Sequence, residues 1–147
     1  MIRHDIASFS VYGGRRTVAE ITDLIGLSPT EWGDAGEQTP AGRARRKCKP
    51  EYLTYPSTYW SLTANADDDG SEEYSGFDAV EALVERLLTR ADAIAELRRD
   101  ARLVMWWSGT SDSEQGGFVL TAELLAGLAT LGCELRGTAS IDEATEE

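Results

Sequence analysis

The sequence predicts an α/β (α+β) fold: a two-layer sandwich of four mainly antiparallel strands with helices on one face, ferredoxin-like in spirit. Two observations predict it. Strand-like and helix-like apolar patterns alternate along the chain as β-α-β-α-β-α-β. Only the run 103–107 is apolar throughout. The other expected strands alternate apolar and polar residues, as strands with one solvent-exposed face do. At 147 residues we expect a single domain over 1–141 and a frayed acidic tail over 142–147.

The first strand and helix have local signals. Residues 6–12 alternate small or polar with apolar side chains and predict a strand. Thr17 and Glu20 have the spacing of a capping box, in which each side chain satisfies a free backbone N–H of the other residue. Gly26 follows the last apolar turn, where a left-handed residue ends a helix. These signals predict a helix from Thr17 to Gly26.

A long connection over 28–52 comes next, because proline and glycine interrupt every period there. Loops of this length in compact domains are usually functional or disordered, and we expect Trp32 to pin part of this one. Residues 57–64 are β-prone and predict a second strand. The acidic run 67–73 is expected to be a solvated loop.

The same patterns predict the C-terminal half. Its expected elements are a helix over 78–99, a central strand over 103–107, a polar turn over 108–115, a helix that Thr121 caps and Gly132 ends, and a last strand over 133–141. Gly116 and Gly117 permit backbone angles that other residues avoid, so we expect a tight turn before the last helix.

The composition excludes several function classes. A formal net charge of −12 argues against a general nucleic-acid binder, because phosphate affinity comes from clustered Lys and Arg. No run approaches the roughly 18 apolar residues of a membrane span. The first residues lack the apolar core of a signal peptide, which predicts a cytoplasmic protein.

Five of the fourteen basic residues nevertheless lie in one short window. They are Arg43, Arg45, Arg46, Lys47 and Lys49. Like charges at this spacing repel, so we expect the segment to be mobile until an acidic group binds it. That group can belong to a protein partner, a substrate or a second copy of the chain. Self-association of this segment with the acidic run 67–73 is the simplest variant.

The tryptophans suggest a binding surface. Trp106 and Trp107 are neighbours in an expected strand, so they must point to opposite faces: one into the core, the other onto the open face or under the connection. A half-exposed tryptophan beside tyrosines and arginines has the composition of a binding hot spot. The predicted binding residues are Trp32, Arg43, Arg45, Arg46, Trp60, Trp106 and Trp107.

A catalytic constellation is not evident. The only histidine, His4, is expected in an N-terminal arm, and Cys48 and Cys133 lack metal-ligand spacing. We therefore expect neither a metal nor a cofactor. Arg15 and Arg16 lie beside a helix start, where free N–H groups can receive an anion.

Several short stretches, in this order and spacing, resemble a known family. They are 21–30, Trp32, Gly36-Glu37, Trp60-Ser61-Leu62, Gly116-Gly117-Phe118, Leu124-Leu125 and Leu131-Gly132. The chain resembles the bacterial family known only as domain of unknown function 4279. The resemblance implies a fold layout and supplies no catalytic residues.

These observations favour a binding protein over an enzyme. The leading hypothesis is a small bacterial accessory or immunity-type protein that recognises another protein, since acidic proteins steer well towards basic partners. The alternative is a small-molecule or anion-binding enzyme whose pocket lies between the sheet face and the connection 28–52. A homo-oligomer is also compatible with the sequence, whereas nucleic-acid and membrane partners are not expected.

Overall fold

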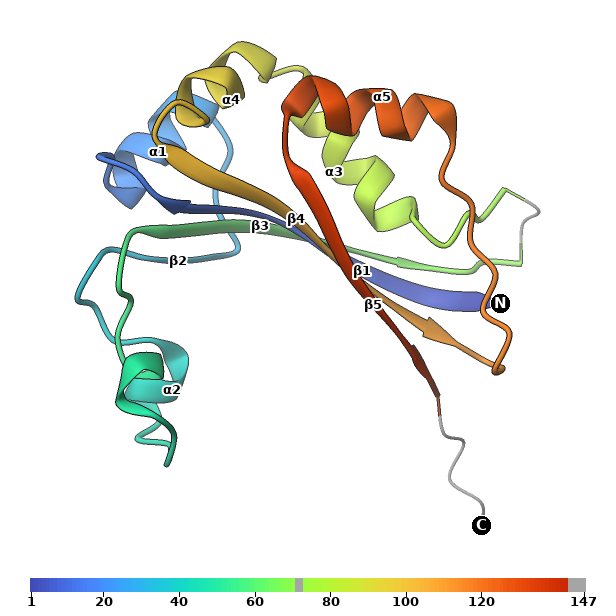
Figure 1. The fold of residues 1–147 in the computed structure, drawn as a ribbon, viewed down its shortest axis with the longest axis horizontal. Helices are drawn as coiled ribbons and strands as arrows, with labels where there is room; N and C mark the ends of the chain where they lie inside the picture. The colour runs from blue at the N-terminus through green and yellow to red at the C-terminus, as the bar shows by residue number, and fades with distance from the viewer. Residues whose placement is uncertain (71–72, 143–147) are drawn as a thin grey trace.

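A computed structural model describes residues 1–70 and 73–142 of the chain. Along these residues the elements are β1 (Ile2–Gly13), α1 (Val18–Ile25), β2 (Glu31–Gly33), α2 (Pro40–Arg43), a 3-10 turn (Pro50–Tyr52), β3 (Tyr59–Asp67), α3 (Asp78–Leu88), α4 (Ala91–Leu97), β4 (Ala101–Ser111), α5 (Ala122–Leu131) and β5 (Glu134–Ile141). The α+β class is confirmed (Figure 1).

The sheet has five strands in the order β2-β3-β1-β4-β5. The pairs β1–β3, β1–β4 and β2–β3 are antiparallel, whereas β4 and β5 are parallel. The predicted four-stranded, mainly antiparallel sheet is therefore corrected to a five-stranded mixed one. α5 returns the chain to the starting end of β4, which makes the last pair parallel. β2 was missed because three residues are too few to show a period.

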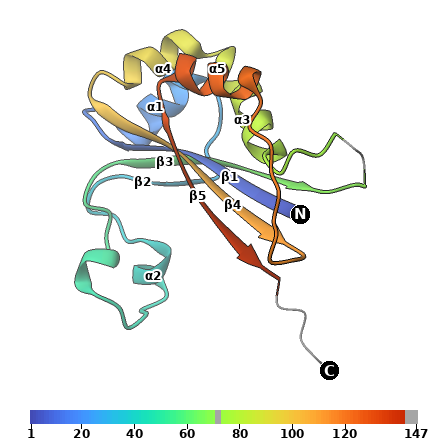
Figure 2. The ribbon, with the colours of Figure 1, turned by 45° about the vertical axis from the view of Figure 1, so that its right-hand side comes forward.

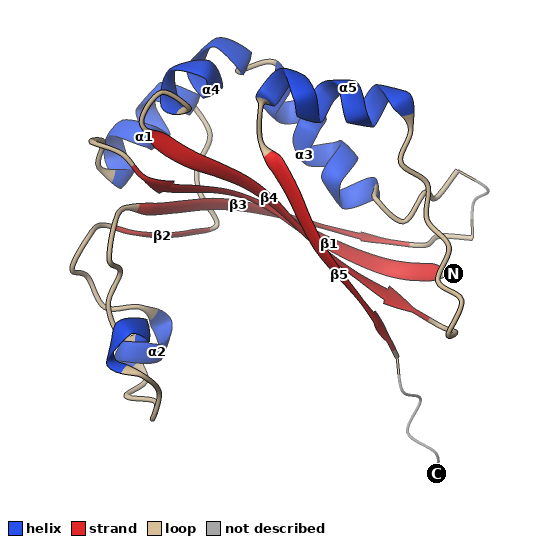
Figure 3. Ribbon diagram, viewed as in Figure 1, coloured by secondary structure: helices blue, strands red, loops and turns tan. Residues whose placement is uncertain are grey.

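The helices α1, α3, α4 and α5 cover one face of the sheet, as Figure 3 shows. Among the described residues no helical layer covers the other face, and α2 lies on that side. Between the sheet and the helices is a continuous apolar core to which alternate residues of β1 contribute, among them Ala7, Phe9 and Val11.

Two tryptophans of the sheet pack and hydrogen-bond on its helical side. Trp60 of β3 is fully buried, and its Nε1–H donates to Thr22 Oγ1 of α1 at 3.1 Å. Trp107 of β4 is 8% exposed, stacks on Phe77 with ring centroids 4.4 Å apart and donates to the Gly76 carbonyl at 2.9 Å. Both indoles therefore bury their rings and satisfy their N–H groups.

The predicted helix ends are confirmed. The Thr17 side chain accepts the Glu20 N–H at 3.2 Å, and Gly26 has φ 74°. At α5, Thr121 accepts the Leu124 N–H at 3.1 Å, and Gly132 has φ 65°. The capping signals of the sequence therefore fix both helices.

The predicted helix over 78–99 is two helices instead. α3 ends at Leu88, and α4 begins at Ala91. Arg90, with φ −119° and ψ 22°, leaves the helical conformation between them. The break redirects the chain so that Ile94 and Leu97 of α4 also reach the core.

The connection over 28–52 contains β2, α2 and the 3-10 turn, and its first part pairs with residues just beyond its end. Gly36 N–H donates to the Tyr55 carbonyl at 2.8 Å, and Tyr55 N–H donates to the Glu37 carbonyl at 2.9 Å. We call residues 34–58 the arm. Figures 1 and 2 show it extending from the β2–β3 end of the sheet on the side away from the helical layer.

Two predicted segments fall partly outside the described residues. In the acidic run 67–73, residues 71–72 are not described, and Asp67 ends β3. In the acidic tail, only Asp142 is described. No helix in the described parts of the chain is long and apolar enough to cross a membrane.

Candidate binding face of the sheet

The helix-free face of the sheet, here called the open face, is rich in hydroxyl groups. Side chains alternate between the two faces of a strand, so the even-numbered residues of β1 from His4 onward point to this face, whereas the register shifts between Ile2 and His4 and Ile2 lies in the core. Ser8 Oγ lies 2.8 Å from Thr63 Oγ1, and Ser10 Oγ lies 2.9 Å from Ser61 Oγ. These pairs leave the middle of the face polar and uncharged.

Four aromatic side chains cross the open face in a line, which we call the aromatic row: Tyr55, Tyr59, Tyr12 and Trp106. Tyr55 stacks on Tyr59 with centroids 5.6 Å apart, and Tyr59 lies 5.4 Å from Tyr12. The Trp106 Nε1–H donates to the Tyr12 hydroxyl at 2.9 Å. At the far end, the Arg136 guanidinium of β5 lies 5.8 Å from the Trp106 ring centroid, within cation–π range.

The row is fixed at its arm end and accessible at its other end. The Tyr55 ring packs on Gly33, where an added Cβ would lie 2.0 Å from it. Tyr55 is 8% exposed, whereas Trp106 is 39% exposed. Burial raises the pKa of both Tyr55 and Tyr59 above the ordinary value, because the buried phenolate would lose solvation. A rigid aromatic surface therefore faces solvent at Trp106.

The basic arm tip comprises Arg43, Arg45, Arg46, Lys47 and Lys49, all exposed. None of the five forms an ion pair within the described part of the chain. Arg43 donates instead to the Gln38 carbonyl at 2.9 Å, and Arg45 adopts φ 52°. The tip is thus a cluster of cations on an otherwise acidic chain.

The structure divides the predicted binding residues among four places. Trp106 lies on the open face, and Arg43, Arg45 and Arg46 lie on the arm. Trp32 is 53% exposed on β2 but pairs with Trp60 in the ladder, so it points to the helical side at the sheet edge.

Trp60 and Trp107 must be corrected as binding residues. Their register places them on the helical face, where both are buried in the core. Four other members of the face are not among the predicted binding residues: Tyr12, Tyr55, Tyr59 and Arg136. The only signal for Tyr12 is its spacing along the strand. It lies on the same face as Ser8 and Ser10, whereas the residues between them are buried.

The anion site expected at Arg15 and Arg16 is not supported. Arg16 pairs with Glu96 at 3.2 Å and with Asp100 at 3.5 Å. The Arg15 N–H donates to Asp100 Oδ2 at 3.0 Å, and the Val18 N–H at the start of α1 donates to Asp34 Oδ1 at 2.9 Å. Carboxylates of the chain itself therefore pair with the Arg16 side chain and with two of the N–H groups beside this helix start.

His4 lies in β1 rather than in a free arm. Its Nδ1 is 2.6 Å from Asp67 Oδ1, on the open face beyond the hydroxyl pairs. This contact ties the N-terminal end of β1 to β3.

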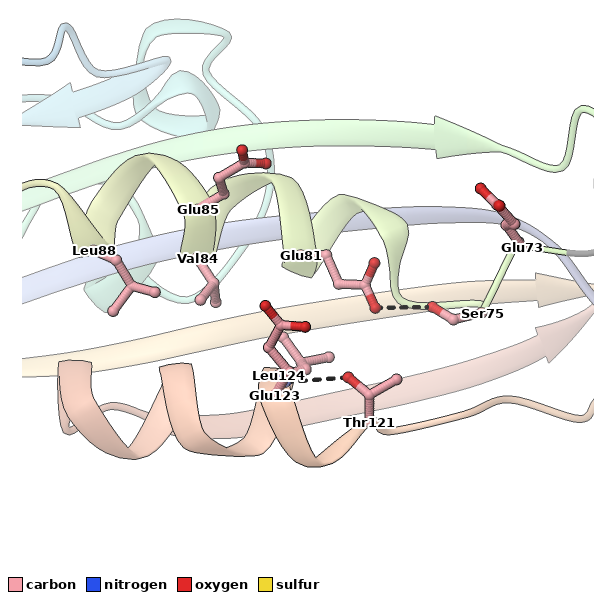
Figure 4. A pocket seen from close by; sticks show the side chains of 9 residues that line it. All are labelled: Glu73, Ser75, Glu81, Val84, Glu85, Leu88, Thr121, Glu123 and Leu124. Atoms are coloured by element: carbon pink, nitrogen blue, oxygen red, sulfur yellow. Dashed lines mark hydrogen bonds between the residues drawn. The ribbon is translucent and has the colours of Figure 1, made fainter.

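A separate groove of about 570 Å³ lies between α3 and α5 (Figure 4). Its lining includes the apolar Val84, Leu88 and Leu124 and the acidic Glu73, Glu81, Glu85 and Glu123. Burial raises the pKa of Glu81, and the nearby Asp78 adds to the effect. Glu81 and Glu123 lie in the first turns of α3 and α5, where a negative charge offsets the helix dipole. None of the residues predicted to form a site lines this groove.

Comparison with known proteins gives one finding. The family described as "Domain of unknown function (DUF4279)" matches the chain over residues 3–140. Searches of curated proteins and of solved structures find no match.

Proposed function

The chain belongs to this DUF4279 family, whose description names no activity, and from the geometry we propose that it is a binding protein that recognises another protein. The open face and the basic arm tip form the recognition surface in this proposal. The observation that carries it is the aromatic row, which crosses the helix-free face and ends in the accessible Trp106.

The chemistry of the face favours a protein partner. Tyr, Trp, Ser and Arg are the residues with which antibodies build their contact surfaces, because aromatic rings supply large contact areas at low entropic cost and hydroxyls adapt their hydrogen bonds. The same aromatic residues and Arg dominate interface hot spots. Here the rings hold one another in place, so little freedom is lost when a partner binds.

The charges indicate what the partner offers. The five cations of the arm tip have no carboxylate partner in the described part of the chain, so an acidic group on the partner can pair with them. The remaining surface is acidic and repels acidic partners elsewhere, which favours one orientation of approach. An accessory or immunity-type role, in which binding assists or blocks the partner, belongs to this proposal.

Cross-linking in cells tests the proposal. A photoreactive amino acid is placed at Ser108, exposed on the open face, or at Ala129, exposed on α5. Only the Ser108 position is expected to capture a specific protein. The partner is then purified, and its affinity is measured by calorimetry.

The affinity measurement uses two matched tryptophan variants. Trp106→Ala is expected to weaken binding by about 30-fold or more, the scale of a hot spot. Trp32→Ala removes a similarly exposed indole from the other side of the sheet and is expected to leave the affinity unchanged. Equal effects of the two substitutions, or capture from Ala129 alone, would contradict the proposed surface.

One observation favours the alternative, a site for a small molecule or anion between the arm and the sheet. The Tyr55 hydroxyl is buried and has no hydrogen-bond partner in the described residues. A buried donor without a partner is unfavourable, so a hydrogen bond from this hydroxyl to a ligand would stabilise the bound state. Titration with inorganic phosphate, followed by NMR of the arm amides in the wild type and in Tyr55→Phe, tests this. Saturable shifts that the variant loses support the alternative, and their absence counts against it.

A further inference from the structure

Within the part of the chain that the structure describes, β5 forms a free edge of the sheet. It pairs with β4 along all eight of its residues and is the last strand in the order β2-β3-β1-β4-β5. Figures 1 and 2 show it at the rim of the sheet. Its outer side therefore presents backbone N–H and C=O groups that a further strand can pair with.

This edge lacks the features that usually prevent pairing. It contains no proline, and the stretch from Gly137 to Ile141 carries no charge. Its charged side chains, Glu134 and Arg136, neutralise each other across 3.1 Å. Two chains of net charge −12 repel least where such a locally neutral strip meets another.

The strand is also complementary to itself. When two copies of one strand pair antiparallel about a two-fold axis, directly opposed residues lie on the same face. With the axis at Ala139, Thr138 opposes Ser140 of the second copy, and Arg136 opposes Asp142. Each pair occurs twice, and hydroxyl pairs and opposite charges are favourable cross-strand neighbours.

Two neighbouring registers bring like charges together, and a register without the Arg136–Asp142 pairs lacks their attraction. An axis at Thr138 sets Glu134 against Asp142, and an axis at Arg136 sets that arginine against itself. Asp142 can take part because its N–H donates to the Ser111 carbonyl at 2.9 Å, which keeps it alongside β4. Arg136 uses its Nε for Glu134, and its guanidinium has further donors for a second carboxylate.

We propose that β5 is a self-association edge, at which a second copy of the chain pairs antiparallel to β5 with Ala139 on the two-fold axis. The pairing joins the two sheets and covers Ile141, which is half-exposed in the single chain. It also places the two open faces next to each other with an arm at each outer end. The inference does not rest on the proposed partner protein, because it uses only the edge strand.

Charge reversal tests the register. In Arg136→Asp, two aspartates oppose each other twice, and in Asp142→Arg two arginines do. Sedimentation velocity over a range of concentrations is expected to show a dimer for the wild type. We expect about a tenfold or greater rise in the dissociation constant for each variant alone. An equimolar mixture of the two variants restores both opposite-charge pairs and is expected to dimerise again.

Arg86→Asp and Asp92→Arg are the controls, because they make the same charge changes at exposed positions of the helical layer. A wild type that stays monomeric at all concentrations would overturn the proposal. So would single reversals that act no differently from these controls, or a mixture that does not recover.

Hydrogen exchange on the wild type provides a readout that needs no substitution. Amides of 136–141 are expected to exchange more slowly as the concentration rises, and exchange that is independent of concentration argues against edge pairing. Trp106→Ala is expected to leave the dimer intact, so failure of this inference and failure of the proposed partner binding give different results.

Discussion

At the scale of single residues, Asp5 shows how a charged group can be built into this core. It is fully buried on the helical side of β1. Its carboxylate accepts the Tyr74 hydroxyl at 2.8 Å and the Ala79 N–H at 3.0 Å, at the start of α3. Asp5 therefore fastens α3 to the sheet, and burial raises the pKa of its carboxyl above the ordinary value.

This raised pKa predicts the pH dependence of stability. A carboxyl with a raised folded-state pKa stabilises most when protonated, so its contribution is full below the ordinary pKa and is lost as pH rises through the folded-state pKa. The difference in unfolding free energy between the wild type and Asp5→Asn should therefore fall as pH rises from about 4. Urea unfolding at several pH values measures this difference. Exposed Asp23→Asn is the control, and a difference that grows with pH would refute this account of Asp5.

The sequence could predict residue roles only where the spacing of apolar residues and the alternation of side chains along a strand were sufficient. Alternation required Trp106 and Trp107 to point to opposite faces, and the structure places Trp107 in the core and Trp106 on the open face. Alternation alone could not show which of the two is buried, because that depends on which face the helices cover. For the same reason the sequence could not show that Trp60 faces inward and that Tyr12 faces the open side.

At the scale of elements, α3 and α5 approach closely at one glycine. A Cβ added at Gly127 would lie 2.6 Å from Val84 Cγ1, and Val84 is only 5% exposed. Alanine is the better helix former by about 1 kcal/mol, but overpacking costs about 1–3 kcal/mol. We therefore expect the cost of overpacking to exceed the gain in helix propensity.

Gly127→Ala should accordingly lower the free energy of unfolding by about 1 kcal/mol, and in a Val84→Ala background it should become stabilising. A double-mutant cycle by urea unfolding gives both values. If Gly127→Ala stabilises the wild type as much as the Val84→Ala variant, the close contact does not limit helix packing.

The arm permits a second prediction at this scale. Replacing Arg43, Arg45 and Arg46 together by alanine removes exposed cations that form no ion pair in the described residues. The free energy of unfolding should change by no more than about 0.5 kcal/mol for each. Association with the cross-linked partner should slow and lose most of its salt dependence, as stopped-flow kinetics can measure. Unchanged association rates would mean that the arm tip is only a solvated connection.

Elements with caps and long periods were predictable, whereas irregular ones were not. Thr17, Gly26, Thr121 and Gly132 fixed the ends of α1 and α5. The break at Arg90 was hidden because the apolar period continues through α4. The arm was expected to be a plain loop, since its two halves pair through backbone groups that leave no pattern in the side chains.

At the scale of the whole molecule, our proposal gives the two faces of the sheet different tasks. One is covered by four helices and holds the core. The other carries the aromatic row, with the basic arm tip beyond its Tyr55 end and the edge strand β5 at its Trp106 end.

The four tryptophans test this division most directly, because Trp106 lies on the open face, Trp32 on the opposite side at the edge, and Trp60 and Trp107 in the core. Their indole N–H signals can be followed by two-dimensional NMR while the cross-linked partner is added. We predict that the Trp106 signal shifts or broadens in proportion to binding, while the Trp32 signal stays in place. A shift of Trp32 with Trp106 unmoved would contradict the claim that the open face of the sheet binds the partner.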